Sequence, residues 1–276
     1  MNKIEFVMYI EGLSSDKKAL ERTIEELVKS IRGEKDFEVE SMKRDEIIET
    51  GEEPLRYSSL IEIRGKGSLE GIFKGVVRYS PAVMEILSPP KMEISAQRLA
   101  NVLADVSLMM QSLMNQFGPL AAYPDLKNRP VARIGYSRDE VEDMILNDRY
   151  ILSRLVVEVA GASRGVIEED LPKALELEGC AINKYTTKLE ERNGKYFGLV
   201  AFELLSDFET LVQLVAKYAP VGLEIVEPEE IDITAGELQN ALTDLSGFVQ
   251  VLVTRPVQEF LTKKKQTKEL SDFHLK

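Results

Sequence analysis

The 276-residue sequence predicts an α+β protein made of two copies of one module, each copy followed by a long helix. Two observations predict this class. Residues 80–114 align without a gap on residues 219–253, and thirteen of the thirty-five pairs are identical. Each copy also carries the same order of strand and helix signals. The length agrees, since a chain of this size holds one large domain or two ordinary ones.

Alternating apolar residues and turn signals predict four strands in each copy. The predicted strands are 4–10, 37–39, 60–63 and 83–87 in the first copy, and 155–159, 181–186, 199–202 and 223–226 in the second. A glycine follows the first strand of each copy, and Gly12 is aligned with Gly161. Asn193-Gly194 is typical of a tight hairpin between the second and third strands.

Two helices separate these strands in each copy. The first begins after the polar run 14–16, which offers N-cap residues. The second begins after Ser68 in the first copy and after Asp207 in the second. It ends before Pro81 or Pro220, because proline cannot continue a helix.

A third helix follows the last strand of each copy. In the second copy it opens with Thr234 and Glu237, the pattern of a capping box. In the first copy its apolar positions, between Leu99 and Phe117, wrap more than half of the helix, which indicates two packing partners. The other copy or a second chain could supply one of them.

The order β-α-β-β-α-β is typical of the ferredoxin-like fold, an antiparallel four-stranded sheet with two helices on one face. We expect the third helix to cover the other face, because an uncovered apolar face is an association site. The chain then divides into a first ferredoxin-like repeat with its extra helix (1–117), a linker with a short helix (118–150), a second repeat with its extra helix (151–260) and a flexible basic tail (261–276). We expect the linker helix to lie in the groove between the repeats.

Composition excludes several classes of function. The net charge of −12 argues against binding a polyanion over a broad surface, so we expect no nucleic-acid partner. No apolar run is long enough for a membrane span, so we expect no membrane partner and a cytoplasmic protein. With one cysteine and one histidine we expect no cofactor and no metal site. Abundant Glu and Lys beside scarce Cys, His and Trp is typical of thermophiles.

The loop after the first strand of the second copy reads Gly161-Ala162-Ser163-Arg164-Gly165. It resembles the start of ACT domains, small ligand-binding regulatory modules. In that family a glycine ends the first strand and an acidic-Arg-Pro-Gly-aliphatic turn enters the helix. Ser163 stands here in the acidic position, and no proline separates Arg164 from Gly165. Asn183 ends a segment that looks like the family's entry to the second strand, shifted by one residue.

The first copy keeps less of this pattern, namely Gly12 with Ser14 and Ser15 in the loop that follows. The resemblance implies a small ligand, usually an amino acid, held by backbone amides of the loop between two modules. A glycine turn that leads into a helix N-terminus would present N–H groups to a carboxylate. The alternative is that the glycines only allow a tight strand-to-helix turn.

A second candidate site is a polar set that recurs in both third helices. Its members are Asn101, Asp105, Ser107 and Gln111 in the first copy and Asn240, Asp244, Ser246 and Gln250 in the second. One interpretation makes them a polar seam where the two helices or two protomers meet. The alternative is a solvated helix face with local Asn–Asp hydrogen bonds.

No catalytic or nucleotide-binding motif is present, and Cys180 has no histidine to activate it. We expect a non-catalytic regulatory protein that binds a small carboxylate-bearing, amino-acid-like ligand at the loop or the repeat interface. One alternative is a protein-interaction or assembly factor with no small ligand. Another is an enzyme with a carboxylate-based site between the repeats. Homodimer formation stays open.

Overall fold

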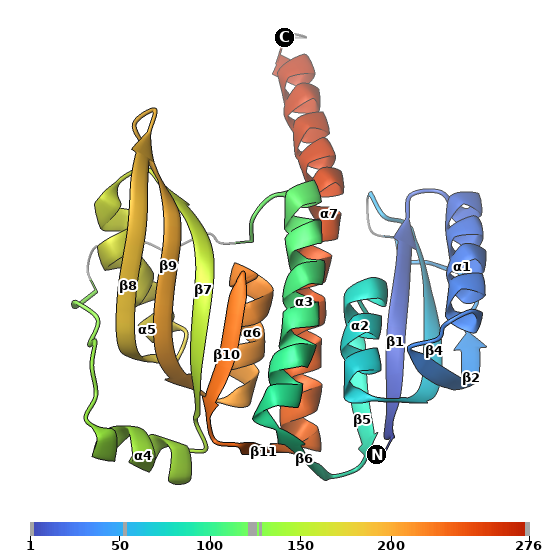
Figure 1. Cartoon of the computed structure of the whole chain (residues 1–276). Helices are drawn as coiled ribbons and strands as arrows, with labels where there is room; N and C mark the ends of the chain where they lie inside the picture. The colour runs from blue at the N-terminus through green and yellow to red at the C-terminus, as the bar shows by residue number, and fades with distance from the viewer. Residues whose placement is uncertain (1–2, 52–53, 121–125, 127–128, 274–276) are drawn as a thin grey trace.

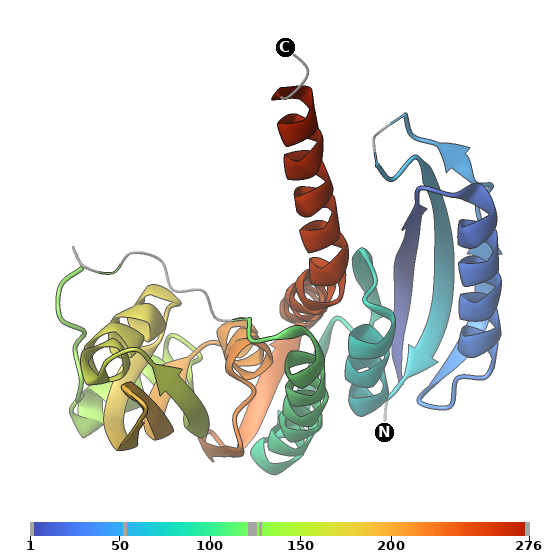
Figure 2. The same ribbon diagram turned by 90° about the horizontal axis from the view of Figure 1, so that it is seen from above.

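The computed structural model describes residues 3–51, 54–120, 126 and 129–273, and gives only the backbone for residues 257–273. Two antiparallel sheets stand on either side of a central pair of long helices (Figure 1). The view from above shows the same three-part arrangement, with the further helices beside their own sheets (Figure 2). The α+β class predicted from the sequence is confirmed.

The first half contains one sheet and two helices before its long helix. In chain order its elements are β1 (Ile4–Ser14), α1 (Lys17–Arg32), β2 (Phe37–Arg44), β3 (Ile48–Glu49), β4 (Tyr57–Gly67), α2 (Leu69–Tyr79), β5 (Val83–Ser88), β6 (Lys91–Ser95) and α3 (Ala96–Phe117). The sheet order is β2-β4-β1-β5, and the short β3 also pairs with β4.

The second half follows the linker helix α4 (Arg138–Leu146). Its elements are β7 (Ile151–Gly161), the single-turn π-helix η1 (Val166–Asp170), α5 (Leu171–Leu177), β8 (Ala181–Arg192), β9 (Lys195–Ser206), α6 (Phe208–Tyr218), β10 (Gly222–Glu227), β11 (Glu230–Thr234) and α7 (Ala235–Phe273). The sheet order is β10-β7-β9-β8, the same sequence of positions as in the first half. All eight predicted strands lie inside observed strands.

Helix ends follow the predicted capping residues. The side chain of Asp16 accepts a hydrogen bond from the amide of Ala19 at 2.7 Å, and Ser68 and Asp207 cap α2 and α6 in the same way. Such contacts satisfy amides that have no partner inside the helix. At the other ends Ser80 and Ala219 are left-handed, with φ of 45° and 42°, just before the two prolines.

The sequence prediction missed the pair β6–β11, which joins the two halves. The strands are antiparallel, with Glu93 opposite Asp232 at the centre. The helices α3 and α7 start directly after them and run side by side in the same direction (Figure 1). Glu93 and Asp232 are 139 residues apart, the offset of the sequence repeat, so matched residues meet there.

The two long helices exchange partners between the halves. Helix α3 packs on β10 and α7 packs on β5, so each lies against the last sheet strand of the opposite half. The hydroxyl of Ser107 donates to the carbonyl of Pro220 at 2.7 Å, and Ser246 donates to Pro81 at 2.5 Å. We call the contacts of α3 and α7 with the opposite half the inter-half seam.

The long helices therefore do not cover the second faces of the sheets, and that prediction is wrong. In the first sheet this face needs no cover, because it is charged. Lys66 contacts Glu5 at 3.2 Å and Glu40 at 2.8 Å, and Lys43 contacts Glu62 at 3.1 Å. Charged side chains that pair across neighbouring strands stabilise a solvent-facing sheet.

The strand registers also correct the alignment of the two glycines. Gly12 pairs with Ser59 and Gly161 with Tyr196, while the repeat offset makes Ser59 equivalent to Gly198, which pairs with Val159. Gly12 thus corresponds to Val159, and Gly161 lies two residues further along. Both glycines face the helix that follows, since an added Cβ would meet Leu20 and Ile24 at Gly12 and Ile167 at Gly161.

The predicted flexible tail begins at residue 261. The backbone of α7 continues as a helix to Phe273, and residues 274–276 lie outside the described part of the chain. Mobility of this segment stays a prediction. Among the described residues, no helix combines the length and the apolar character that a membrane crossing requires.

Glu34, just after α1, is a buried carboxylate, with 3% of its side chain exposed. It accepts hydrogen bonds from Tyr79 Oη at 2.6 Å, Arg78 Nη1 at 2.5 Å and the amides of Lys35 and Asp36. Burial alone would raise its pKa, but the hydrogen bonds outweigh burial and lower the pKa of Glu34 from 4.5 to about 2.

We predict that this carboxylate makes the fold acid-sensitive. Because the pKa of Glu34 is lower in the folded chain than in the unfolded chain, its stabilisation is present above about pH 4.5 and is lost as the pH falls toward 2. Urea unfolding at pH 2.5 to 6 should show the free energy of unfolding falling less steeply in Glu34→Gln than in the wild type. Parallel curves would contradict the prediction.

Candidate functional site

The outer face of the second sheet, on the side away from α5 and α6, is built in three zones. Helix α4 covers the first zone, where Val141 packs against Leu152 and Leu205. The linker helix therefore lies on this sheet and not in the groove between the halves. The expected position is wrong because Leu152 and Leu205 form an apolar patch at this end of the outer face.

A buried carboxylate occupies the middle zone. Glu203 accepts hydrogen bonds from Arg154 Nε at 2.7 Å and Asn183 Nδ2 at 2.7 Å, and Lys184 Nζ lies 2.8 Å away. Burial would raise the pKa of Glu203, but these donors hold it below its ordinary value. The carboxylate is thus fixed in its charged form and has no proton to exchange near neutral pH.

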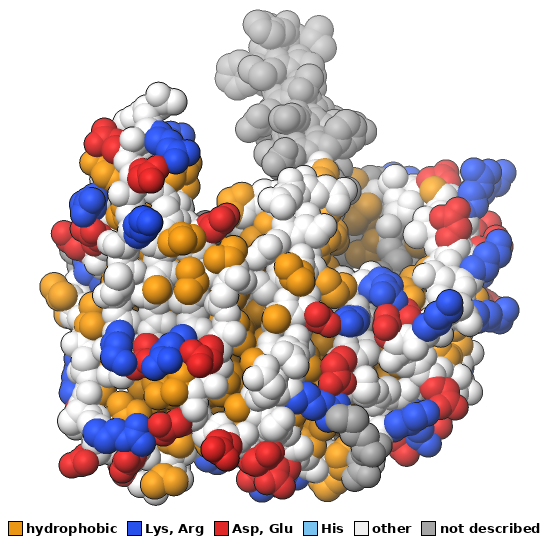
Figure 3. All heavy atoms as spheres, viewed as in Figure 1, with side chains coloured by type: hydrophobic (Ala, Val, Ile, Leu, Met, Phe, Trp, Pro, Cys, Tyr) orange, Lys and Arg blue, Asp and Glu red, His pale blue; other side chains and the backbone are white. Residues whose placement is uncertain are grey.

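The third zone, near the β8–β9 hairpin, is open, and we call it the upper face. Phe197 and Leu199 on β9 are 39% and 40% exposed. They line an open depression of about 420 Å³. The other lining residues are Glu158, Val159, Lys188, Glu190, Arg192 and Gly198. Figure 3 shows apolar side chains over this sheet, between a group of charged side chains near the hairpin and a second charged band nearer α4.

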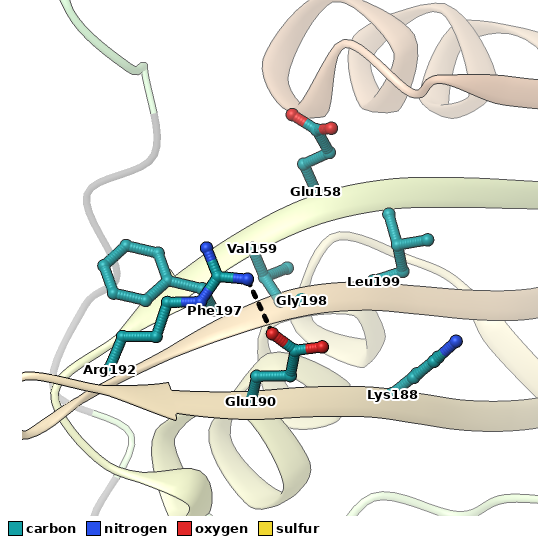
Figure 4. Close-up of a pocket in the computed structure, with 8 residues that line it drawn as sticks. All are labelled: Glu158, Val159, Lys188, Glu190, Arg192, Phe197, Gly198 and Leu199. Carbon is teal, nitrogen blue, oxygen red and sulfur yellow. Dashed lines mark hydrogen bonds and ion pairs between the residues drawn. The ribbon is translucent and has the colours of Figure 1, made fainter.

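The strand register fixes how these side chains alternate. Leu199 lies between Lys188 on β8 and Glu158 on β7, and Phe197 lies opposite Glu190. Directly opposite residues point to the same face of a sheet. Figure 4 shows Phe197 and Arg192 close to the hairpin, with Arg192 Nη2 donating to Glu190 at 2.6 Å. The upper face therefore presents one ring, one aliphatic side chain and a mixed charged rim.

The first sheet lacks such a surface. The offset of 139 residues places Ser58 and Leu60 at the positions of Phe197 and Leu199. Ser58 is buried and donates to Glu11 at 2.9 Å, and Leu60 is only partly exposed. The two halves thus share a scaffold and differ in the face they display.

The predicted ligand loop Gly161–Gly165 satisfies its own polar groups. Ser163 Oγ accepts the amide of Val166 at 3.3 Å, and Arg164 Nη1 donates to Glu168 at 3.0 Å. Ala162 is exposed, Gly161 ends β7 with its Cα facing Ile167, and the φ of Gly161 is not in the left-handed region. Gly161 therefore does not serve a left-handed turn, and its lack of a side chain allows close approach of the helix.

The loop of the first copy is closed in a similar way. Ser14 Oγ accepts the amide of Asp16 at 3.1 Å, and Asp16 caps α1. Ser15 is exposed. Gly12 lies under α1, where an added Cβ would meet side-chain carbons of Leu20 and Ile24 at 2.9 Å.

Asn183 does not join the loop at Gly161. It lies near the start of β8, at the opposite end of the sheet from the β7 terminus, and its amide donates to Glu203. Its carbonyl oxygen accepts the amide of Tyr136 at 3.2 Å, which fastens the linker to the sheet. The ACT-like residues are therefore not brought together in the structure.

The recurring polar set divides between two roles. Gln111 donates to the carbonyl of Ala219 and Gln250 to that of Ser80, both at 3.0 Å across the inter-half seam. The aspartates stay within their own half. Lys74 pairs with Asp105 at 2.8 Å and Gln213 with Asp244 at 2.6 Å.

The asparagines also stay within their own half. Asn101 accepts a hydrogen bond from Gln97, one turn earlier in the same helix, and Asn240 donates to Glu209 on α6. Neither crosses the seam. Only the serines and glutamines of the set use the opposite half.

Cys180 is buried, and burial raises the pKa of its thiol, which leaves it protonated and unreactive. Residues 3–51, 54–120, 126 and 129–256 hold no cluster of three or more His, Cys, Asp and Glu side chains placed to bind a metal ion. The upper face is thus an open surface on the sheet, and Phe197 and Leu199 were not predicted as site residues from the sequence.

Comparison with known proteins places the chain in a family. The model of the MJ0538 family matches residues 5–259. The MJ0538 protein of Methanocaldococcus jannaschii is 24% identical over 254 residues, which cover 90% of this chain and 95% of the relative. No solved structure matches the chain.

Proposed function

We propose that this chain, which belongs to the MJ0538 family, is a non-catalytic binding protein whose upper face holds an extended partner. The observation that carries the proposal is the contrast between the two sheets. Ion pairs occupy the face of the first, and the second exposes Phe197 and Leu199 around a depression of about 420 Å³. Exposed apolar side chains with a polar rim mark an interaction site.

We further propose that the scaffold is an internal duplication of two ferredoxin-like modules, residues 1–117 and 151–260, with 118–150 as a linker. The equal strand orders and the matched contacts across the inter-half seam support this interpretation. A module of this kind has a free sheet face. In this proposal the first face was neutralised by ion pairs, and the second was kept for binding.

The contacts of the Gly161 loop and of the seam glutamines support the small-ligand interpretation less well than binding on the upper face. In the loop at Gly161, Arg164 is paired with Glu168 and the amide of Val166 is bonded to Ser163, so a carboxylate ligand that used these groups would have to displace both contacts. Gln111 and Gln250 are occupied in the seam. We therefore place binding on the upper face, in a protein that we expect to work in the cytoplasm.

Thermal denaturation with three sets of probes tests this proposal. The probes are the twenty amino acids, random single-stranded oligonucleotides and a library of short peptides. We expect one set to raise the melting temperature, because binding to the folded state alone stabilises it by about 2.7 kcal/mol at a ligand concentration of 100 times Kd. The rise should disappear in Phe197→Ala with Leu199→Ala and persist in Arg164→Ala. A response lost in Arg164→Ala alone would return the site to the loop.

A further inference from the structure

We infer that the partner of the upper face is a short segment of single-stranded RNA, laid across β7, β9 and β8. This inference rests on the proposed function, since it names the occupant of the same surface. Its basis is the combination of an exposed ring, a specific strand pattern and three cations within a mixed charged rim.

The exposed ring is placed as a stacking platform. Phe197 stands on β9, a central strand of the sheet, so a base could lie on the ring with its neighbours on the adjoining strands. Open four-stranded sheets bind single-stranded RNA by stacking unpaired bases on aromatic side chains of this kind. Leu199, two residues along the same face, offers an apolar surface to the next base.

The pattern of β9 separates stacking residues from core residues. The strand reads Lys195-Tyr196-Phe197-Gly198-Leu199-Val200-Ala201-Phe202. RNA-binding sheets carry a related pattern on their third strand, a basic residue and Gly followed by aromatic, small, aromatic and aliphatic residues, with a final aromatic one place beyond. This strand departs from it at two positions, where Tyr196 replaces Gly and Leu199 replaces an aromatic residue.

The structure gives each position a physical reason. Val200 and Phe202 are 0% and 2% exposed and belong to the core, while Phe197 and Leu199 point outward. Gly198 has no substitute, because an added Cβ would lie 2.0 Å from the carbonyl oxygen of Lys188 on β8. The absence of a side chain at Gly198 thus lets β8 approach β9 closely.

Three cations lie where the phosphates of a short strand would run. Lys188, Arg192 and Lys195 lie on β8 and at the start of β9, within reach of phosphates on either side of a stacked base. Glu158 and Glu190 balance part of this charge, and the acidic chain repels a long polyanion, so the site suits a few nucleotides.

One carboxylate on the face favours RNA over DNA. Glu158 can accept a hydrogen bond from a ribose 2′-hydroxyl, while Glu190 already accepts one from Arg192. DNA lacks this donor. A peptide could also bury Leu199, but an aliphatic peptide segment would not require a ring at residue 197.

The test measures fluorescence anisotropy of a labelled random octaribonucleotide with the full chain at 50 mM salt. We expect binding that weakens with salt, with a slope of log affinity on log salt near −2 for about three phosphate contacts. Lys188→Gln and Lys195→Gln should each reduce that slope by about 0.7. The octadeoxyribonucleotide and a duplex RNA should bind more weakly.

Variants at residue 197 separate stacking from simple apolar contact. Phe197→Tyr keeps the ring and should bind like the wild type, while Phe197→Leu should weaken binding roughly 5- to 100-fold. Leu60→Ala, at the equivalent of Leu199 in the first sheet, is the matched control and should change nothing. Because Phe197 and Leu60 are both partly exposed, circular dichroism should show all three variants folded.

Several results would overturn this inference. They are wild-type affinity in Phe197→Leu, equal affinity for the DNA octamer, or no RNA binding below 1 mM. The proposed function would survive any of these if the thermal panel still found a partner whose effect is lost in Phe197→Ala. Loss of every response in that panel would remove both.

Discussion

We expect the first half of the chain, residues 1–118, to form a folded homodimer when it is produced alone. In the full chain α3 packs on β10 of the second half, while β5 of the first half is covered by α7. Without α7, the first half would expose β5 and one side of α3. Two copies could cover both surfaces at once, because the seam is formed by matched residues in the two halves.

The contacts needed for that dimer are already present in the first half. Ser107 would donate to Pro81 of the second copy as it now donates to Pro220, and Gln111 would reach the carbonyl of Ser80. At the base, Lys91 now contacts Asp232 at 2.8 Å. Glu93 is the repeat equivalent of Asp232, so a dimer would gain two such ion pairs.

The second half should dimerise less well for the same reason. Its equivalent of Lys91 is Glu230, which would face Asp232 of the other copy and repel it. Exposed ion pairs contribute about 0.2–1 kcal/mol each. Replacing two attractive contacts by two repulsive ones should weaken the dimer by about tenfold.

Size-exclusion chromatography with light scattering measures this outcome, with the mass of the full chain measured alongside. Lys91→Glu in the first half should weaken its dimer, and Glu230→Lys in residues 129–273 should strengthen the other. If the first half stays folded and monomeric at micromolar concentration, β5 does not need a covering helix, and the prediction is wrong.

The sequence was sufficient to predict the strands and caps because each of these is a local property. The alternation from Ile4 to Ile10 and the caps Asp16, Ser68 and Asp207 depend on neighbours within a few residues. The repeat further indicated that the polar residues of the third helices have similar surroundings. Both kinds of inference need no knowledge of which elements meet in space.

The strands β6 and β11 were missed because they have no sheet of their own. Each is five residues long, follows a proline and pairs only with the other, so the partner is almost 140 residues away. Likewise, the charged outer face of the first sheet was readable in Glu5, Glu62 and Lys66. The expected covering helix followed from a general rule for apolar sheet faces, and this rule does not apply to a face that carries these charged residues.

The candidate site shows the limit of reasoning from motifs. The glycines near a helix start pointed to Gly161 and Arg164, but Glu168 lies four residues after Arg164, the spacing at which helix side chains pair, and this contact was overlooked. Phe197 lies outside the strand predicted at 199–202, and the observed β9 begins earlier, at Lys195. The meaning of Phe197 and Leu199 depended on the absence of a covering element over that part of the sheet, which only the three-dimensional arrangement supplies.

The last prediction compares one substitution, Gly to Ala, at two helix positions of this chain. Gly71 lies in the first turn of α2, where an added Cβ would sit 2.0 Å from the carbonyl oxygen of Asp36. That oxygen cannot retreat easily, because Arg78 Nη2 donates to the Asp36 side chain at 2.9 Å and Glu34 accepts the Asp36 amide. Gly247 lies in α7, with nothing within 4 Å of the added atom.

Alanine favours a helix over glycine by about 1 kcal/mol, so propensity alone would make both variants more stable. At Gly71 the overlap with backbone outweighs that gain, since forced backbone shifts cost about 1–3 kcal/mol or more. We therefore expect Gly71→Ala to lose about 3 kcal/mol and Gly247→Ala to gain about 0.5–1 kcal/mol in free energy of unfolding. Urea unfolding of both variants measures the difference. Equal stability of the two would show that the α1–β2 turn moves freely away from α2.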